Sequence, residues 1–87
     1  MAFEIIFQRN AEKGLKALKS RPALMRRVMR FLDELASNPY TASAKKLLGE
    51  WEGCYSYHAG PIRVIYEIHK QTLKIYVLDI GPRGDIY

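Results

Sequence analysis

The sequence contains a single cysteine, Cys54, and no apolar run that approaches the length of a membrane span. One cysteine excludes an internal disulfide and is typical of proteins of the reducing cytoplasm, where we expect this chain to act. Glu4 and Arg9 interrupt the short apolar stretch near the first residue, so we predict no secretory signal and no membrane partner. The simplest role for Cys54 is that of a small buried hydrophobic residue.

Acidic residues are also scarce. Nine Asp and Glu stand against 14 Lys and Arg, which gives a net charge of +5 over 87 residues and a pI near 9.5. This balance favours a polyanionic partner, either a nucleic acid or an acidic protein segment, although many basic small proteins bind neither. The length and the 48% hydrophobic content are typical of one globular domain, which we expect to span residues 1–87.

Several motifs of known chemistry are missing. There is no internal repeat, no Walker-type glycine loop and no paired acid site. His58 and His69 lack the accompanying cysteine or carboxylate spacing of a metal site, so we predict no metal and no cofactor.

The first half of the chain predicts a strand and two helices. Residues 3–7 form a short apolar strand, and residues 10–19 have helical periodicity with Asn10 as a candidate N-cap. Pro22 suits the first turn of a second helix over residues 22–37, which Asn38-Pro39 ends. Since the connection is short, the helices should form an antiparallel hairpin that a sheet must cover.

The second half predicts strands. Residues 45–49 form a brief strand or turn, residues 54–58 a strand, and residues 62–69 and 73–80 an antiparallel hairpin. The fold class is therefore α+β, with an N-terminal strand, a two-helix hairpin and a mostly antiparallel sheet of three to four strands packed on the helices.

An arginine lies inside the first strand of this closing hairpin. Strand alternation places Val64 and Tyr66 on one face and Arg63, Ile65 and Glu67 on the other. Because a guanidinium is costly to bury, we expect Arg63 to look into a solvated concavity or at an anion. The competing interpretation is that Arg63 pairs with Glu67 along its own strand face.

Taken together, these segments resemble the RelE/ParE superfamily of bacterial type II toxins over essentially the whole chain. The resemblance depends on the helix hairpin, Lys45-Lys46-Leu47-Leu48-Gly49, Arg63-Val64-Ile65-Tyr66, and Gly81-Pro82-Arg83 with Tyr87 four residues on. It implies a ribosome-dependent endoribonuclease, or mRNA interferase, that cuts mRNA in the ribosomal A site, beside 16S rRNA. Cleavage would occur by attack of the 2′-hydroxyl without a metal. It also implies a cognate antitoxin that blocks the toxin in a hetero-oligomer.

The resemblance also assigns catalytic residues. Arg63 and Arg83 match positions that hold the scissile phosphate, a role that suits the planar guanidinium fork. Tyr87 matches a tyrosine that serves in proton transfer or base stacking. Where well-known members carry two lysines, this chain has Ser56 and His58, and histidine suits a general base because its unperturbed pKa is about 6.5.

Further basic residues are candidates for non-specific contacts with RNA phosphates. They are Lys45, Lys46, Arg26, Arg27 and Arg30, and a plain solvated face is the alternative interpretation. Two other functions also remain open: a ParE-like inhibitor of DNA gyrase without nuclease activity, and a non-catalytic basic RNA-binding module.

Overall fold

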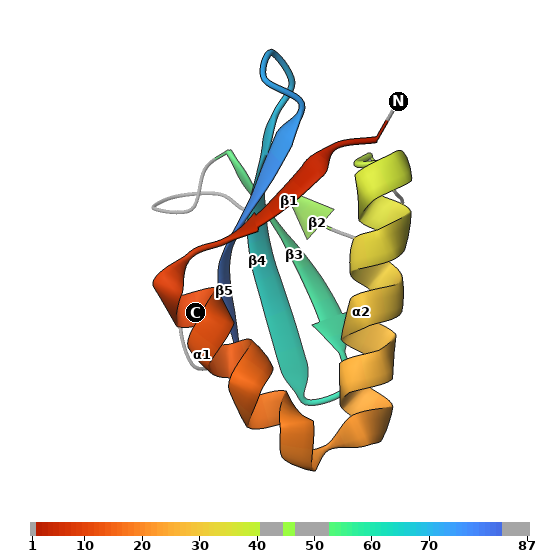
Figure 1. Ribbon diagram of the computed structural model, residues 1–87, viewed down its shortest axis with the longest axis vertical. Coiled ribbons are helices and arrows are strands. Elements are labelled where there is room, and N and C mark those ends of the chain that lie inside the picture. The colour runs from red at the N-terminus through yellow and green to blue at the C-terminus, as the bar shows by residue number, and fades with distance from the viewer. Residues whose placement is uncertain (1, 41–44, 47–52, 83–87) are drawn as a thin grey trace.

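The computed structural model describes residues 2–40, 45–46 and 53–82. Figure 1 shows the elements in chain order. They are β1 (Glu4–Phe7), α1 (Arg9–Ala17), a 3₁₀ turn (Leu18–Ser20), α2 (Pro22–Ser37), β2 (Lys45–Lys46), β3 (Cys54–Ala59), β4 (Ile62–His69) and β5 (Lys74–Pro82).

The two helices form a splayed hairpin, with α2 confirmed at its predicted bounds and Pro22 in its first turn (Figure 1). Helix α1 begins earlier than predicted. Its N-cap is Gln8, whose side chain makes no capping bond, so the prediction of Asn10 as the cap is wrong. The backbone N–H of Gln8 donates instead to the carbonyl of Val77 in β5 at 2.9 Å, which fixes the passage from β1 into α1.

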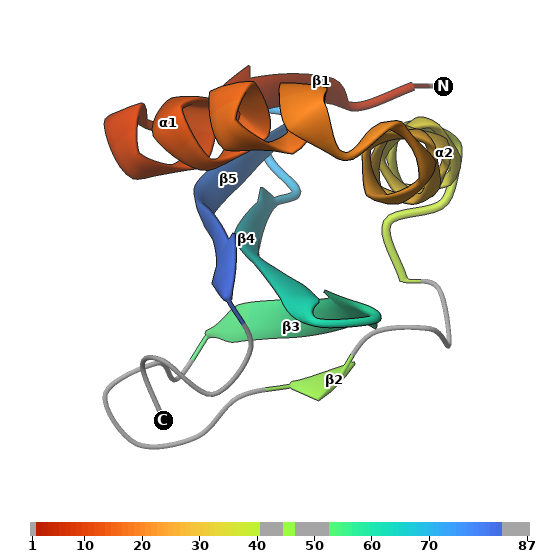
Figure 2. The same cartoon turned by 90° about the horizontal axis from the view of Figure 1, so that it is seen from below.

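Within the described residues, the sheet has five strands in the order β1-β5-β4-β3-β2. Strands β2 to β5 are antiparallel to their neighbours, as predicted, while β1 joins the edge parallel to β5. The four strands β2 to β5 confirm the predicted sheet of three to four strands, and the predicted N-terminal strand joins it as a fifth through a long-range contact with the C-terminal strand. Figure 2 shows that the sheet is strongly twisted, with β2 and β3 turned away from the helix layer.

The core lies between the helices and one face of the sheet. From α2 it takes Val28, Phe31 and Leu35, and from β4 it takes Val64 and Tyr66, all of them buried. The ring of Phe31 stacks on that of Tyr57 in β3, with centroids 3.8 Å apart. The predicted alternation of β4 is therefore confirmed, because Val64 and Tyr66 share the core face.

Two irregularities shape β4 and β5. The pairing register shifts between Ile65 and Tyr66, which marks a β-bulge. Strand β5 also runs past its predicted end at residue 80 through Gly81 and Pro82, because both residues still pair with the start of β4. The extension brings the carbonyl of Pro82 within reach of Arg63.

Neither α1 nor α2, the helices of the described ranges, has the length and apolarity that a bilayer crossing requires.

Candidate functional site

The sheet face opposite the helices carries a set of polar residues that we call the polar sheet face: Ser56 and His58 of β3, Arg63 of β4 and Asp79 of β5. The strand register places them side by side. His58 is the cross-strand partner of Arg63, and Ser56 and Asp79 both pair with Ile65, one from each side. Opposed residues of antiparallel strands have Cβ atoms about 5 Å apart, so these side chains belong to one site.

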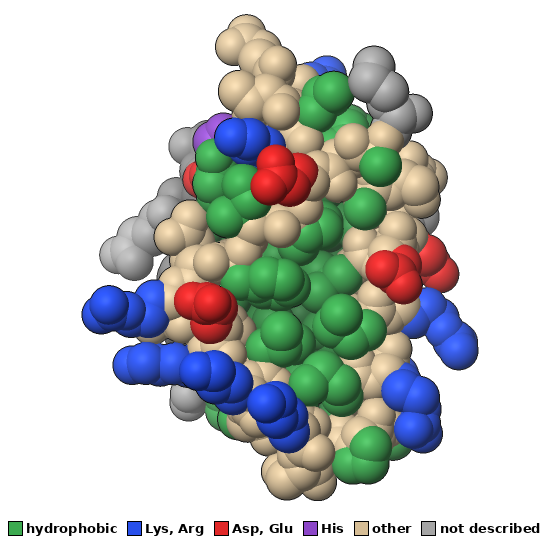
Figure 3. Space-filling view, viewed as in Figure 1, with side chains coloured by type: hydrophobic (Ala, Val, Ile, Leu, Met, Phe, Trp, Pro, Cys, Tyr) green, Lys and Arg blue, Asp and Glu red, His purple; other side chains and the backbone are tan. Residues whose placement is uncertain are grey.

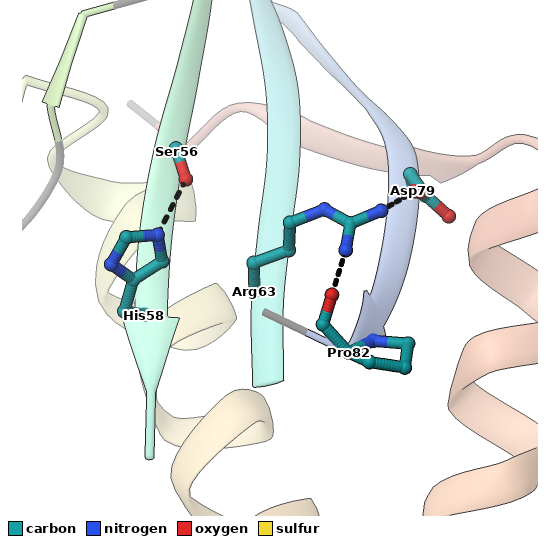
Figure 4. Close-up of polar contacts among 5 residues, drawn as sticks. All are labelled: Ser56, His58, Arg63, Asp79 and Pro82. Carbon is teal, nitrogen blue, oxygen red and sulfur yellow. Dashed lines mark hydrogen bonds and ion pairs between the residues drawn. The ribbon is translucent and has the colours of Figure 1, made fainter. Parts of the chain in front are cut away.

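Arg63 is buried, with only 2% of its side chain exposed. Its Nη2 lies 2.5 Å from Oδ2 of Asp79, and its Nη1 donates to the carbonyl of Pro82 (Figure 4). The expectation that Arg63 looks into a solvated concavity is therefore wrong, whereas the expected anion is present as the carboxylate of Asp79. The neighbouring strand supplies a carboxylate and a carbonyl that offset the cost of burying the charge. The Nε atom has no hydrogen-bond partner among the residues that the structure describes.

The alternative pairing of Arg63 with Glu67 is also wrong. Glu67 lies further along β4, where its Oε1 is 2.8 Å from Nε2 of His69. Glu67 also lies near the buried thiol of Cys54, at 4.0 Å. Burial, and then the nearby Glu67 carboxylate, raise the pKa of the Cys54 thiol. Cys54 is 5% exposed, which confirms its prediction as a buried residue.

His58 lies at the partly exposed end of β3 with its Nε2 3.3 Å from Oγ of Ser56. Figure 4 shows the imidazole beside Ser56, while the guanidinium of Arg63 is directed toward β5 and away from His58. The guanidinium lies against Gly81, where an added Cβ would be 3.7 Å from Nη2. The site thus has two parts: an imidazole and hydroxyl on β3, and a guanidinium held on β5.

The other predicted residues of the site lie on the neighbouring strand β2 or outside the described residues. Lys45 is the register partner of Ser56, and Lys46 is exposed opposite Tyr55. Arg83 and Tyr87 fall outside the described residues, and so the meeting of Arg63 with Arg83 stays a prediction.

The three arginines of α2 are exposed. Arg27 and Arg30 line a pocket between α2 and β3 together with Phe31, Glu34 and Tyr57, whereas Arg26 does not line it. Their contact with RNA phosphates stays a prediction.

A second surface lies on the helix side. Phe7, Leu15 and Met25 line an apolar groove, which we call the α1–α2 groove, and Glu12, Lys16 and Lys19 edge it. Figure 3 shows hydrophobic side chains running continuously over this part of the molecule, with Lys and Arg side chains to either side. An apolar surface of this kind with a charged rim is characteristic of a protein interface.

Known toxins share this architecture. The structure of the archaeal RelE–RelB complex from Pyrococcus horikoshii matches with a TM-score of 0.80 and 28% identity, over 98% of this chain and 99% of that one. The RelBE2 toxin–antitoxin complex of Mycobacterium tuberculosis matches with a TM-score of 0.79 and 24% identity, over 95% and 100%. The YoeB/ParE toxin of Agrobacterium tumefaciens reaches 0.83 at 10% identity, over 93% and 99%.

The fold is therefore that of the RelE-like toxins, as the sequence predicted. No curated protein sequence matches significantly. The family model described as the ParE toxin of the type II toxin–antitoxin system parDE matches residues 5–87. The chain belongs to this toxin family.

Asp79 is the residue of the site that sequence reasoning missed. Its signal was present, since it is the sole carboxylate of the apolar segment 73–80. Pairing it with Arg63 required the register of β4 and β5, and the bulge after Ile65 shifts that register by one residue.

Proposed function

We propose that this toxin is a ribosome-dependent endoribonuclease that cuts mRNA by attack of a ribose 2′-hydroxyl. The observation that supports it is the cross-strand pairing of His58 with Arg63 on the polar sheet face. An imidazole that can accept a proton and a guanidinium that can bind phosphate are two of the groups that this reaction needs. The net charge of +5 favours association with RNA.

In the proposed reaction, His58 takes the proton of the 2′-hydroxyl as the 2′-oxygen forms its bond to phosphorus. The bond from phosphorus to the 5′-oxygen breaks, and that oxygen receives a proton, for which Tyr87 is the candidate donor. The products are a 2′,3′-cyclic phosphate and a 5′-hydroxyl, with no water consumed. Arg63 and Arg83 bind the phosphate oxygens, where they stabilise the charge that develops in the transition state.

The chain offers a matched pair of variants because it has only two histidines. His58→Ala should slow cleavage of a translated message on purified ribosomes by about 10²- to 10⁴-fold, the usual contribution of a general base. His69→Ala should cut at the unsubstituted rate, since His69 lies at the far end of β4, paired with Glu67. Equal cleavage by the two variants would remove His58 from the reaction.

We further propose that a cognate antitoxin covers the α1–α2 groove in a hetero-oligomer. The similar archaeal RelE was solved as a complex with RelB. The apolar floor of Phe7, Leu15 and Met25 fits one face of an amphipathic helix. Lys16 and Lys19 at the rim fit acidic side chains at the border of that helix.

A second candidate function is inhibition of DNA gyrase without chemistry, which the matched ParE family model and the ion pair of Arg63 with Asp79 favour. A guanidinium neutralised inside the protein suits a structural role. The two functions differ in what induction does to the cell. Cleaved transcripts with intact chromosomes support the nuclease, and broken chromosomes with intact transcripts support the gyrase inhibitor.

A further inference from the structure

The guanidinium of Arg63 is occupied within the protein. One terminal nitrogen is bound to the carboxylate of Asp79 and the other to the carbonyl of Pro82. We propose that the Asp79 carboxylate is an exchangeable stand-in for an RNA phosphate, so that Asp79 is a positioning residue that controls access to Arg63. This inference rests on the proposed function, because the nuclease reaction supplies the phosphate that replaces the carboxylate.

The chemistry of the two ligands is the same. Carboxylate and phosphate oxygens both accept charge-assisted hydrogen bonds from a guanidinium. One of the three guanidinium nitrogens of Arg63 is left over, since its buried Nε has no hydrogen-bond partner among the described residues. A phosphate, with more oxygens than a carboxylate, can engage that donor together with Nη2, whereas Asp79 reaches Nη2 alone.

The pair is exposed on one side only. The side chain of Asp79 is 18% exposed and that of Arg63 is 2% exposed, so solvent reaches the ion pair at the carboxylate. An incoming anion would therefore meet Asp79 first and displace it toward water. Pro82 would meanwhile keep its bond to Nη1, so that the guanidinium stays placed over Gly81 when the carboxylate leaves.

Exchange has a measurable consequence. A phosphate can bind Arg63 only while Asp79 is displaced. The apparent affinity for phosphate is therefore the intrinsic affinity multiplied by the fraction of molecules in which Asp79 has left Arg63. Removing the charge of Asp79 should thus raise the affinity of Arg63 for anions. It should also weaken the fold in the absence of anions, because a buried guanidinium loses its counter-charge.

The test compares Asp79→Asn with Glu67→Gln, which removes a carboxylate of the same strand pair that contacts His69 and not Arg63. Chemical unfolding is followed at low ionic strength while inorganic phosphate is titrated. We expect Asp79→Asn to be less stable without phosphate and to bind it at least about tenfold more tightly than the unsubstituted protein. Glu67→Gln should bind phosphate like the unsubstituted protein, and Arg63→Met added to Asp79→Asn should abolish the gain. A phosphate response of Asp79→Asn equal to that of Glu67→Gln would overturn the proposal.

A measurement on the unsubstituted protein gives an independent answer. Titration with an RNA whose scissile ribose lacks the 2′-hydroxyl should shift the NMR signals of the Arg63 guanidinium and the Asp79 carboxyl together, with one affinity. Binding of this RNA without any change at Asp79 would also overturn the proposal. Neither measurement involves cleavage, so an inactive protein whose Asp79 still exchanges would contradict the nuclease assignment and leave the anion site in place.

Discussion

Gly14 of α1 lies directly against Ile80 of β5. A Cβ placed on Gly14 would stand 1.8 Å from the carbonyl oxygen of Ile80, so only glycine allows the helix this close to the strand. Ile80 precedes Gly81 and Pro82, and the Pro82 carbonyl holds Arg63. The contact between helix and strand therefore fixes the end of β5 that holds Arg63.

Gly14→Ala should destabilise the protein. Overpacking costs about 1–3 kcal/mol, and the clash here is with backbone, which cannot rotate away. That cost should exceed the roughly 1 kcal/mol that alanine gains over glycine in a helix. Urea unfolding measures the difference, with Lys13→Ala on the exposed side of the same helix as the control, expected within about 0.5 kcal/mol of the unsubstituted protein. A Gly14→Ala variant more stable than the unsubstituted protein would show that α1 does not pack as described.

Tyr66→Phe should leave stability unchanged or raise it by up to about 1 kcal/mol. Tyr66 is fully buried between Phe31 and Tyr55, and its hydroxyl has no hydrogen-bond partner among the described residues. Removing the hydroxyl therefore removes an unmet polar group and keeps the ring contacts. Denaturant unfolding at neutral pH measures the change, and a loss above about 1 kcal/mol would mean that the hydroxyl is bonded after all.

The same phenol predicts a response to alkali. Burial, and then the neighbouring Tyr55, raise the pKa of Tyr66 well above its ordinary value of 10.0. Below that value both folded and unfolded chains keep the proton, and stability is unaffected. Above it the unfolded chain ionises first, so stability falls with rising pH by up to about 1.4 kcal/mol per pH unit. Tyr66→Phe should show a shallower fall above pH 10.0, and identical slopes for both proteins would contradict the burial of the phenol.

Cys54 should resist thiol reagents in the folded protein. Burial and the nearby Glu67 raise the pKa of its thiol, and the thiolate is the form that reacts. At mildly alkaline pH we expect labelling in buffer to be at least about tenfold slower than in denaturant. Glu67→Gln should accelerate it modestly, since burial is the larger cause. Equal rates in buffer and denaturant would contradict the buried position.

Charge reversal at the α1–α2 groove should weaken antitoxin binding. Lys16→Glu combined with Lys19→Glu places negative charge at the rim, and we expect association with the antitoxin to be about tenfold slower at low salt. Lys13→Glu reverses one charge on α1 at a position that does not line the groove, and is the control for Lys16→Glu and Lys19→Glu made singly. If all three substitutions slow association equally, general charge and not the groove guides the antitoxin.

The sequence predicted most of the fold because its signals were local. Apolar spacing marked α2, and β-branched runs with a turn between them marked β4 and β5. Strand alternation placed Arg63 on the face opposite Val64 and Tyr66, which the core confirms. The parallel pairing of β1 with β5 joins the two ends of the chain, and no local pattern carries it.

The surroundings of Arg63 depended on register, which sequence does not give. The rule that a guanidinium is costly to bury predicted either solvent or an anion beside Arg63. In the structure the carboxylate of Asp79, on the neighbouring strand β5, offsets that cost. The β-bulge at Ile65 shifts the pairing of β4 with β5, so the position of Asp79 opposite Ile65 does not follow from the turn alone. The charge of Arg63 inside an apolar strand correctly indicated a residue of the site, but its partner, Asp79, lies 16 residues further along the chain.

The chemistry of the cut RNA ends tests the central claim most directly. Purified toxin is incubated with ribosomes on a defined message, and the new termini are identified by enzymatic end-labelling and mass spectrometry. Attack by the 2′-hydroxyl predicts a 2′,3′-cyclic phosphate upstream and a 5′-hydroxyl downstream, both strongly reduced by His58→Ala. A 3′-hydroxyl paired with a 5′-phosphate, or a message left whole, would contradict the account.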